Sequence, residues 1–165
     1  MITIRKSTAA DVARVLDIFR RAVDATHDFL SAAHRRDIDR EVAALLPAVA
    51  LDLAVDEHDR PLGFMLLTAV RDEAGRAVEG HLQALFVDPD HHGSGIGRAL
   101  VEDAIRRCSG LIATDVNEHN VQAMGFWERM SFYRYDRSAT DGAGRPYPLI
   151  HMRFRPPRPE QPTRP

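Results

Sequence analysis

The chain has little cysteine and no long apolar run, and these two features argue against a disulfide-bonded and a membrane-spanning protein. Its single cysteine, Cys108, cannot form a disulfide within the chain, which predicts a reducing, cytoplasmic environment. No apolar run approaches the length of a membrane span, and the early charges Arg5 and Lys6 are unlike a secretory signal. The formal net charge of −2 gives no basic field for nucleic acid. We therefore expect a cytoplasmic protein without membrane or nucleic-acid partners.

The histidines do not form a metal-binding pattern, although the chain has eight of them. His91 and His92 are adjacent, whereas a helical zinc pair needs ligands one turn apart, and no cysteine or carboxylate spacing completes a site. We expect no metal. The length predicts one domain over residues 1–154, and the proline-rich residues 155–165 are predicted to be a disordered tail.

Hydrophobic periodicity and turn residues predict the element order βααβββαβαββ. This order indicates an α/β (α+β) fold with a mixed, mostly antiparallel sheet of about seven strands and helices on both faces. Strands are expected at about residues 2–5, 51–55, 62–70, 82–87, 111–117, 132–135 and 149–154, and helices at about 11–24, 31–46, 96–108 and 121–130.

The segment 81–107 contains an anion-binding pattern. Three glycines alternate in Gly93-Ser94-Gly95-Ile96-Gly97, so the loop has few Cβ atoms between a ligand and its backbone N–H groups. The loop leads directly into a predicted helix, whose free N–H donors and dipole favour phosphate oxygens. Arg98 in the first turn adds a positive charge. The pattern favours a diphosphate ligand.

Two common nucleotide-binding loops do not match this segment. In a G-x-G-x-x-G fingerprint the sixth position is glycine, but here it is Arg98 or Leu100. No G-K-[ST] run exists, which excludes a Walker A loop. A ligand-free helix cap is the remaining alternative, and it leaves both the preceding turn 87–89 and the arginine unexplained.

The run Val87-Asp88-Pro89, followed by 92–100 (HGSGIGRAL), resembles the acetyl-CoA loop of the GCN5-related N-acetyltransferases. The family pattern is Gln or Arg, two residues, Gly, one residue, and Gly or Ala, and His92 stands where that family usually has Gln or Arg. The resemblance extends from about Thr3 to Phe154. It implies the acyl-CoA N-acyltransferase fold, acetyl-CoA as co-substrate, and direct transfer to a primary amine in a ternary complex.

The resemblance also implies a set of cofactor-binding residues. Backbone groups of the fourth strand would bond pantetheine as a pseudo-strand, and an N–H at or beside Val87 would stabilise the oxyanion. Asn120 and Phe126 match the family pattern N-x-x-A-x-x-F, and Asn120 would bond the pantetheine arm. The implied set is Leu85, Phe86, Val87, His92, Gly93, Ser94, Gly95, Ile96, Gly97, Arg98, Ala99, Asn120 and Phe126.

The catalytic acid and base are less clearly marked. Asp115 and His81 are the candidate bases, and the alternative is that each is a solvated polar group at a strand end. Where relatives often carry an acidic tyrosine, this chain has Trp127, which cannot release a proton and is expected to pack beside the cofactor. Tyr147, Tyr133 or solvent would then protonate the thiolate.

We expect the acceptor to approach from the first helix pair, at His27-Asp28-Phe29, with Tyr147 lining the same pocket. The alternative is that Phe29 packs at the helix junction while His27 is solvated. A small-molecule or peptide amine would be the acceptor, and the protein would be a monomer or homodimer. Transfer of another acyl group, such as succinyl, and a CoA-binding sensor without activity both remain open alternatives.

Overall fold

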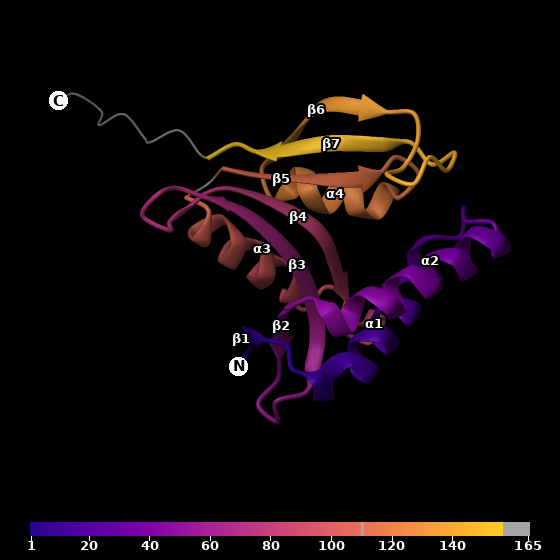
Figure 1. Cartoon of the computed structure of the whole chain (residues 1–165). Coiled ribbons are helices and arrows are strands. Elements are labelled where there is room, and N and C mark those ends of the chain that lie inside the picture. The colour runs from indigo at the N-terminus through magenta and orange to yellow at the C-terminus, as the bar shows by residue number, and fades with distance from the viewer. Residues whose placement is uncertain (110, 157–165) are drawn as a thin grey trace.

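The computed structural model describes residues 1–109 and 111–156, and within them seven strands form one sheet in the order β1-β2-β3-β4-β5-β7-β6 (Figure 1). The β4–β5 pair is parallel, and the other neighbouring pairs are antiparallel. The predicted order of elements and the mixed sheet are confirmed. The strands are β1 (Thr3–Lys6), β2 (Asp52–Val55), β3 (Pro61–Arg71), β4 (Ala77–Val87), β5 (Ile112–Asn117), β6 (Phe132–Ser138) and β7 (Leu149–Phe154).

Local capping contacts mark the 3₁₀ turn that leads into the first helix and the start of the second helix. Thr8 N–H donates to Asp11 Oδ2 over 2.8 Å before the first helix, and Ser31 Oγ accepts from His34 N–H over 3.2 Å at the start of the second. The helices are α1 (Val12–Thr26), α2 (Ala32–Leu45), α3 (Ile96–Arg107) and α4 (Val121–Arg129), with single 3₁₀ turns at Ala9–Asp11, Leu46–Ala48 and Pro89–His91.

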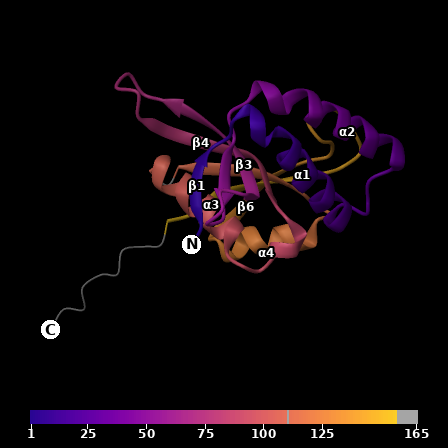
Figure 2. The same cartoon turned by 90° about the horizontal axis from the view of Figure 1, so that it is seen from below.

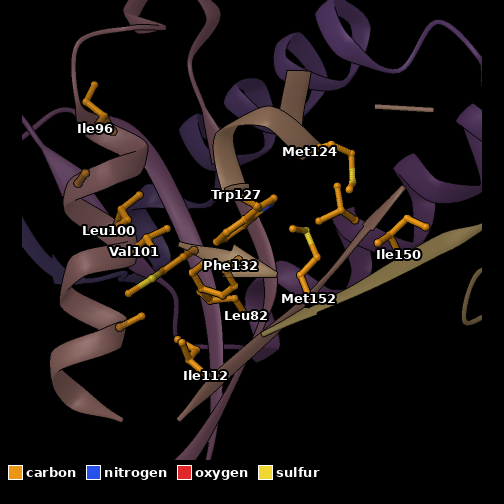
Figure 3. Packing of buried hydrophobic residues seen from close by; sticks show 14 of the residues in the cluster. Leu82, Ile96, Leu100, Val101, Ile112, Met124, Trp127, Phe132, Ile150 and Met152 are labelled. Atoms are coloured by element: carbon orange, nitrogen blue, oxygen red, sulfur yellow. The ribbon is translucent and has the colours of Figure 1, made fainter. Parts of the chain in front are cut away.

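The helices cover both faces of the sheet, as expected (Figure 2). On one face, Ile18 and Phe19 of α1 pack against Leu53 and Phe64 of the sheet. On the other face, α3 and α4 bury a larger cluster, of which Figure 3 shows a part. Each sheet face therefore has its own apolar core, and the central strands β3 and β4 are held between the two.

Two strands are longer than the sequence pattern predicted. β4 begins at Ala77 because Asp72 closes a tight hairpin, its Oδ1 accepting from the backbone N–H groups of Ala74 and Arg76. β6 continues to Ser138, which pairs with Leu149 of β7. Both extensions carry polar residues, so hydrophobic periodicity gave no signal for them.

In the described part of the chain, no helix has both the length and the apolarity that crossing a membrane requires. Likewise, no group of three or more His, Cys, Asp or Glu side chains in residues 1–109 and 111–156 is arranged to hold a metal ion. Most of the predicted disordered tail, 157–165, lies outside the described residues.

Candidate active site

The strands β4 and β5 pair over only three residues and then separate. Gly80, His81 and Leu82 pair with residues 112–114, and Thr114 Oγ1 donates to the Leu82 carbonyl over 2.9 Å. Directly after this segment the β3–β4 register shifts, which leaves one extra residue in β4. Such a bulge bends and twists its strand. The bulge thus explains why β4 turns away from β5. Within the described part of the chain, the last residues of β4, 83–87, have no partner strand on that side.

The glycine loop has the backbone geometry that its sequence predicted. Gly93 and Gly95 have φ angles of 78° and 85°, in the left-handed region that favours glycine. Gly95 is the N-cap of α3, and no side chain caps that helix terminus. A Cβ on Gly97 would lie 3.4 Å from Phe126 Cζ, so glycine allows close packing of α3 against α4. The first N–H groups of α3 therefore remain available to an anion.

Two side-chain contacts fix the loop, one to the end of β4 and one to the 3₁₀ turn that follows it. His92 Nε2–H donates to the Val87 carbonyl over 3.0 Å, and Ser94 Oγ donates to the His91 carbonyl over 2.5 Å. Arg98 is 71% exposed and pairs with Glu102 one turn further along α3. The His92 side chain thus positions the loop, while the Arg98 guanidinium remains accessible from solvent.

Asp88, which begins the turn after β4, is an anchor that the sequence reasoning missed. Its side chain is 3% exposed and bonds Arg14 over 2.5 Å and Arg21 over 2.8 Å. Burial alone would raise the pKa of Asp88, but the Arg14 guanidinium and the Asp90 N–H hold it below its usual value. The signal was present, because Arg14 and Arg21 are two helical turns apart and so share one face of α1.

A cavity of about 520 Å³ lies between the glycine loop, the unpaired end of β4 and the start of α4. Every predicted cofactor-binding residue except Ser94 and Ala99 lines it. Asn120 caps α4 by accepting from Ala123 N–H over 3.1 Å, which leaves its NH₂ group able to donate. A phosphate-binding loop at one end and an unpaired strand edge beside it fit an extended diphosphate-containing ligand such as acetyl-CoA.

The predicted acceptor residues separate into two groups. His27 lines the cavity, whereas Asp28 is exposed and does not. Phe29 packs between the ring of His27, at 5.3 Å, and that of Tyr147, at 6.0 Å. Burial, followed by the charge of Arg35, lowers the pKa of His27, and Asp28 opposes this shift.

Tyr147 lies outside the cavity lining and is buried. Its hydroxyl accepts from the Ser31 N–H over 3.1 Å and lies 2.6 Å from His34 Nδ1. These contacts join the β6–β7 loop to the start of α2. The geometry thus gives Tyr147 a structural contact beside the acceptor region, and its assignment as proton donor stays a prediction.

The two predicted bases are in direct contact, because His81 Nε2 lies 3.2 Å from Asp115 Oδ2. The other carboxylate oxygen, Oδ1, is 2.5 Å from His151 Nδ1, and His151 Nε2 is 2.6 Å from Ser138 Oγ. Neither His81 nor Asp115 lines the cavity. The sequence reasoning missed His151, although a histidine between the apolar residues of the last strand was a visible signal.

Trp127 packs as expected. It is 5% exposed, and its ring lies 4.8 Å from that of Phe132 (Figure 3). The ring of Phe126 lies 5.2 Å away. Trp127 is also one of the residues that line the cavity. Its position therefore supports the cavity wall from within the core that α3 and α4 form.

The comparisons with known proteins agree with this geometry. The sequence profile of the Acetyltransferase (GNAT) family matches residues 13–132. The chain is 45% identical to the peptidyl-lysine N-acetyltransferase YjaB of Salmonella typhimurium, over 92% of this chain and 97% of that protein. It is 42% identical to the Escherichia coli protein of the same name, over 93% of this chain and 97% of that protein.

Solved structures give the same result. The solution structure of apo-form YjaB from Escherichia coli superposes with a TM-score of 0.83, covering 93% of this chain and 97% of that one. The PaiA N-acetyltransferase of Thermoplasma acidophilum, solved with coenzyme A, shares the fold at 18% identity, with a TM-score of 0.70 and coverage of 93% and 99%.

The chain belongs to the acetyltransferase (GNAT) family. It is an N-acetyltransferase that takes its acetyl group from acetyl-CoA and transfers it to a primary amine.

Proposed function

We propose that the acceptor is the side-chain ammonium of a lysine in a peptide or protein, and that His81 is the base that deprotonates it. The contact between His81 Nε2 and Asp115 Oδ2 carries this proposal. Because a carboxylate only accepts hydrogen bonds, Nε2 holds the proton and the Nδ1 of neutral His81 keeps its lone pair. Asp115 acts as the group that orients the imidazole.

The charges of the pair support this division of roles. The hydrogen bond to Asp115 raises the pKa of His81, and burial opposes the shift. The pKa of Asp115 is lowered, first by His81 and also by His151, against the effect of burial. A base works best when its pKa is near the working pH, so His81 is better matched to the task than the more acidic Asp115.

The location of the pair suits an acceptor on a larger molecule. Leu82 and Met152 point into the core under α3 and α4, so their strand neighbours His81 and His151 project from the opposite face. The side chains of His81 and Asp115 are 37% and 33% exposed. A lysine side chain can therefore approach from solvent, and the two most similar relatives reported above are both named peptidyl-lysine acetyltransferases.

The cavity residues have defined roles in this proposal. Acetyl-CoA supplies the acetyl group as a thioester. The free N–H groups at the start of α3 and the Arg98 guanidinium would hold its diphosphate, and the unpaired edge of residues 85–87 would hold the pantetheine arm. A backbone N–H at or beside Val87 would stabilise the oxyanion.

Mass spectrometry of acetylated peptides tests the acceptor. The protein is incubated with acetyl-CoA and a peptide that has one lysine and a blocked N-terminus, and the matched control peptide has arginine in place of the lysine. We expect one acetyl group on the lysine and an equal release of CoA thiol. Transfer only to small amines or to N-terminal amines would contradict the proposal. Binding of acetyl-CoA with no thiol release for any amine would favour the sensor alternative, and a succinyl-CoA arm tests the acyl group.

We also propose a cytoplasmic location, which the single buried cysteine supports. The assignment as a monomer or homodimer stays a prediction that sedimentation measurements can test.

A further inference from the structure

The imidazole of His27 lies in the cavity and has a defined tautomer. Thr26 Oγ1 donates to the Ala22 carbonyl over 2.7 Å, and the same oxygen lies 2.7 Å from His27 Nδ1. Because a hydroxyl has one proton, and that proton goes to Ala22, His27 Nδ1–H must be the donor in the second contact. Neutral His27 therefore holds its proton on Nδ1 and a lone pair on Nε2.

The Nε2 lone pair of His27 is part of the cavity lining. No hydrogen bond to His27 Nε2 is found within the described ranges 1–109 and 111–156. The ring lies 6.4 Å from that of Phe86, which is part of the unpaired end of β4. Burial and Arg35 of α2 lower the pKa of His27, and the adjacent Asp28 opposes them, so the environment favours the neutral ring. The basic nitrogen is thus unprotonated beside the strand that is to hold the thioester arm.

Acetyl transfer to an ammonium requires two proton transfers. One proton leaves the ammonium before attack, and His81 accepts it and passes it to solvent. The attacking nitrogen must lose a second proton once the N–C bond has formed, and the sulfur must gain one as the C–S bond breaks. The overall balance is one proton to solvent and one on the CoA thiol.

We infer that His27 Nε2 carries this second proton, taking it from the attacking nitrogen and giving it to the sulfur. The nitrogen lone pair becomes the N–C bond, and the electron pair of the C–S bond stays on the sulfur, which leaves as the thiol. The imidazole ends the cycle neutral, as it began. This role rests on the proposed function, and it supplies the proton donor that Trp127 cannot be.

Other groups in the cavity lining are less suited to this transfer. His92 Nε2–H is bonded to the Val87 carbonyl at the glycine loop. Arg98 and Arg129 have guanidinium groups, which donate hydrogen bonds and accept none. His91 lies in the 3₁₀ turn next to the glycine loop, at the end of the cavity proposed to hold the diphosphate and not the CoA sulfur. The His27 ring lies instead beside the ring of Phe86, which belongs to the unpaired end of β4.

Nitrogen-15 NMR of the histidine rings tests the tautomer without acetyl-CoA. The His27 signals are assigned as those lost in His27→Asn. We expect a protonated Nδ1 and an unprotonated Nε2 at pH 7, and in Thr26→Val, which removes the acceptor for Nδ1–H, a shift of population toward the other tautomer. A proton on Nε2 in the unmodified protein would overturn the inference.

Kinetics of His27→Asn test the proton transfer, because asparagine keeps an N–H donor near the Nδ1 position and lacks Nε2. We expect acetyl-CoA affinity within about twofold of the original, a kcat lower by about a hundredfold, and partial rescue by added imidazole. The matched control is His58→Asn, in the exposed turn between β2 and β3, which should leave both constants unchanged.

The possible results separate this inference from the proposed function. Unchanged kcat in His27→Asn would overturn the inference and leave the lysine acetyltransferase function intact. A loss of acetyl-CoA affinity that parallels the loss of kcat would also overturn it, because that pattern indicates a packing role. If the unmodified protein transfers no acetyl group to the lysine peptide, the proposed function and the inference both fail.

Discussion

The side chains of His81 and Asp115 meet across the parallel strands β4 and β5, with His81 Nε2 3.2 Å from Asp115 Oδ2. His81 pairs with Ala113, and Asp115 is two residues further along β5, so the two side chains are diagonal neighbours on one sheet face. The paired segment ends one residue later, at Leu82. The pair of polar side chains therefore lies where β4 and β5 begin to separate.

The first prediction concerns the pH dependence of acetyl transfer. Neutral His81 is the active base, and Asp115 raises its pKa above the ordinary value near 6.5. We expect kcat/KM for a lysine peptide to rise with pH through a midpoint above 6.5. Asp115→Asn removes the charge that favours the imidazolium, so the midpoint should move to lower pH. An unchanged pH–rate profile in Asp115→Asn would remove Asp115 from this role.

Replacing His81 itself should remove the base. We expect His81→Gln to lower kcat/KM by about a hundredfold near neutral pH, in the range that general-base catalysis contributes. Acetyl-CoA affinity, measured by calorimetry, should not change because His81 lies outside the cavity lining. Exposed His58 again offers a control, as His58→Gln should behave like the original protein. Equal activity of the two variants would contradict the assignment of His81.

The glycine loop can be tested with a pair of matched substitutions. Gly95→Asp places a negative charge beside the proposed diphosphate site and strains a φ of 85°. We expect acetyl-CoA affinity to fall at least about tenfold, since like charges repel at this helix terminus. Gly75→Asp imposes similar strain at a φ of 77° in the β3–β4 turn and should leave affinity unchanged. Equal affinities of the two variants would refute the loop assignment.

The Asp88 anchor should be important for stability. Asp88→Asn leaves Arg14 and Arg21 without their buried partner, and we expect a loss of about 2–3 kcal/mol of unfolding free energy in urea. This is below the full cost of breaking a buried pair, because the arginines are 34% and 38% exposed. Asp17→Asn, which removes the exposed partner of Arg14, should cost under about 1 kcal/mol.

The same anchor has a defined pH dependence. Its folded pKa is lowered, so the ionised form contributes stability above the ordinary value near 4 and loses it as pH falls through the folded pKa. The difference between the original protein and Asp88→Asn should therefore shrink below about pH 4. A difference that stays constant down to pH 2.5 would contradict this origin.

Trp127 should behave as a packing residue. Trp127→Phe removes part of a buried ring from the core, and we expect about 1–2 kcal/mol of lost stability by circular dichroism. The kcat should stay within about twofold, since the indole has no proton to give near neutral pH. A kcat loss above about tenfold with full acetyl-CoA affinity would instead assign the indole a part in the reaction.

Much of the fold was readable from local pattern. Apolar periodicity and turn residues depend only on near neighbours, so they predicted the element order and a mixed sheet. The cofactor site was equally local, because the loop 93–97, the strand before it and the helix after it are continuous in the chain. Ser94 and Ala99 are the predicted cofactor residues that do not line the cavity.

The lengths of the strands were less readable. The first residues of β4 show no regular apolar alternation, and the last of β6 are polar, so their strand structure comes from pairing with β3 and β7. The register shift opposite Leu66 and Leu67 likewise has no signature in the sequence, although it directs β4 away from β5.

The sequence by itself determined the class of fold, and it predicted the acetyl-CoA loop and the side chains that could act as bases. Only the tertiary structure decided how those side chains act together. Strand register joins Ser138, His151, Asp115 and His81 into one chain of polar contacts over four strands, and α1 brings His27 to the cavity. These contacts link residues far apart in sequence, and long-range packing, not local propensity, sets their geometry.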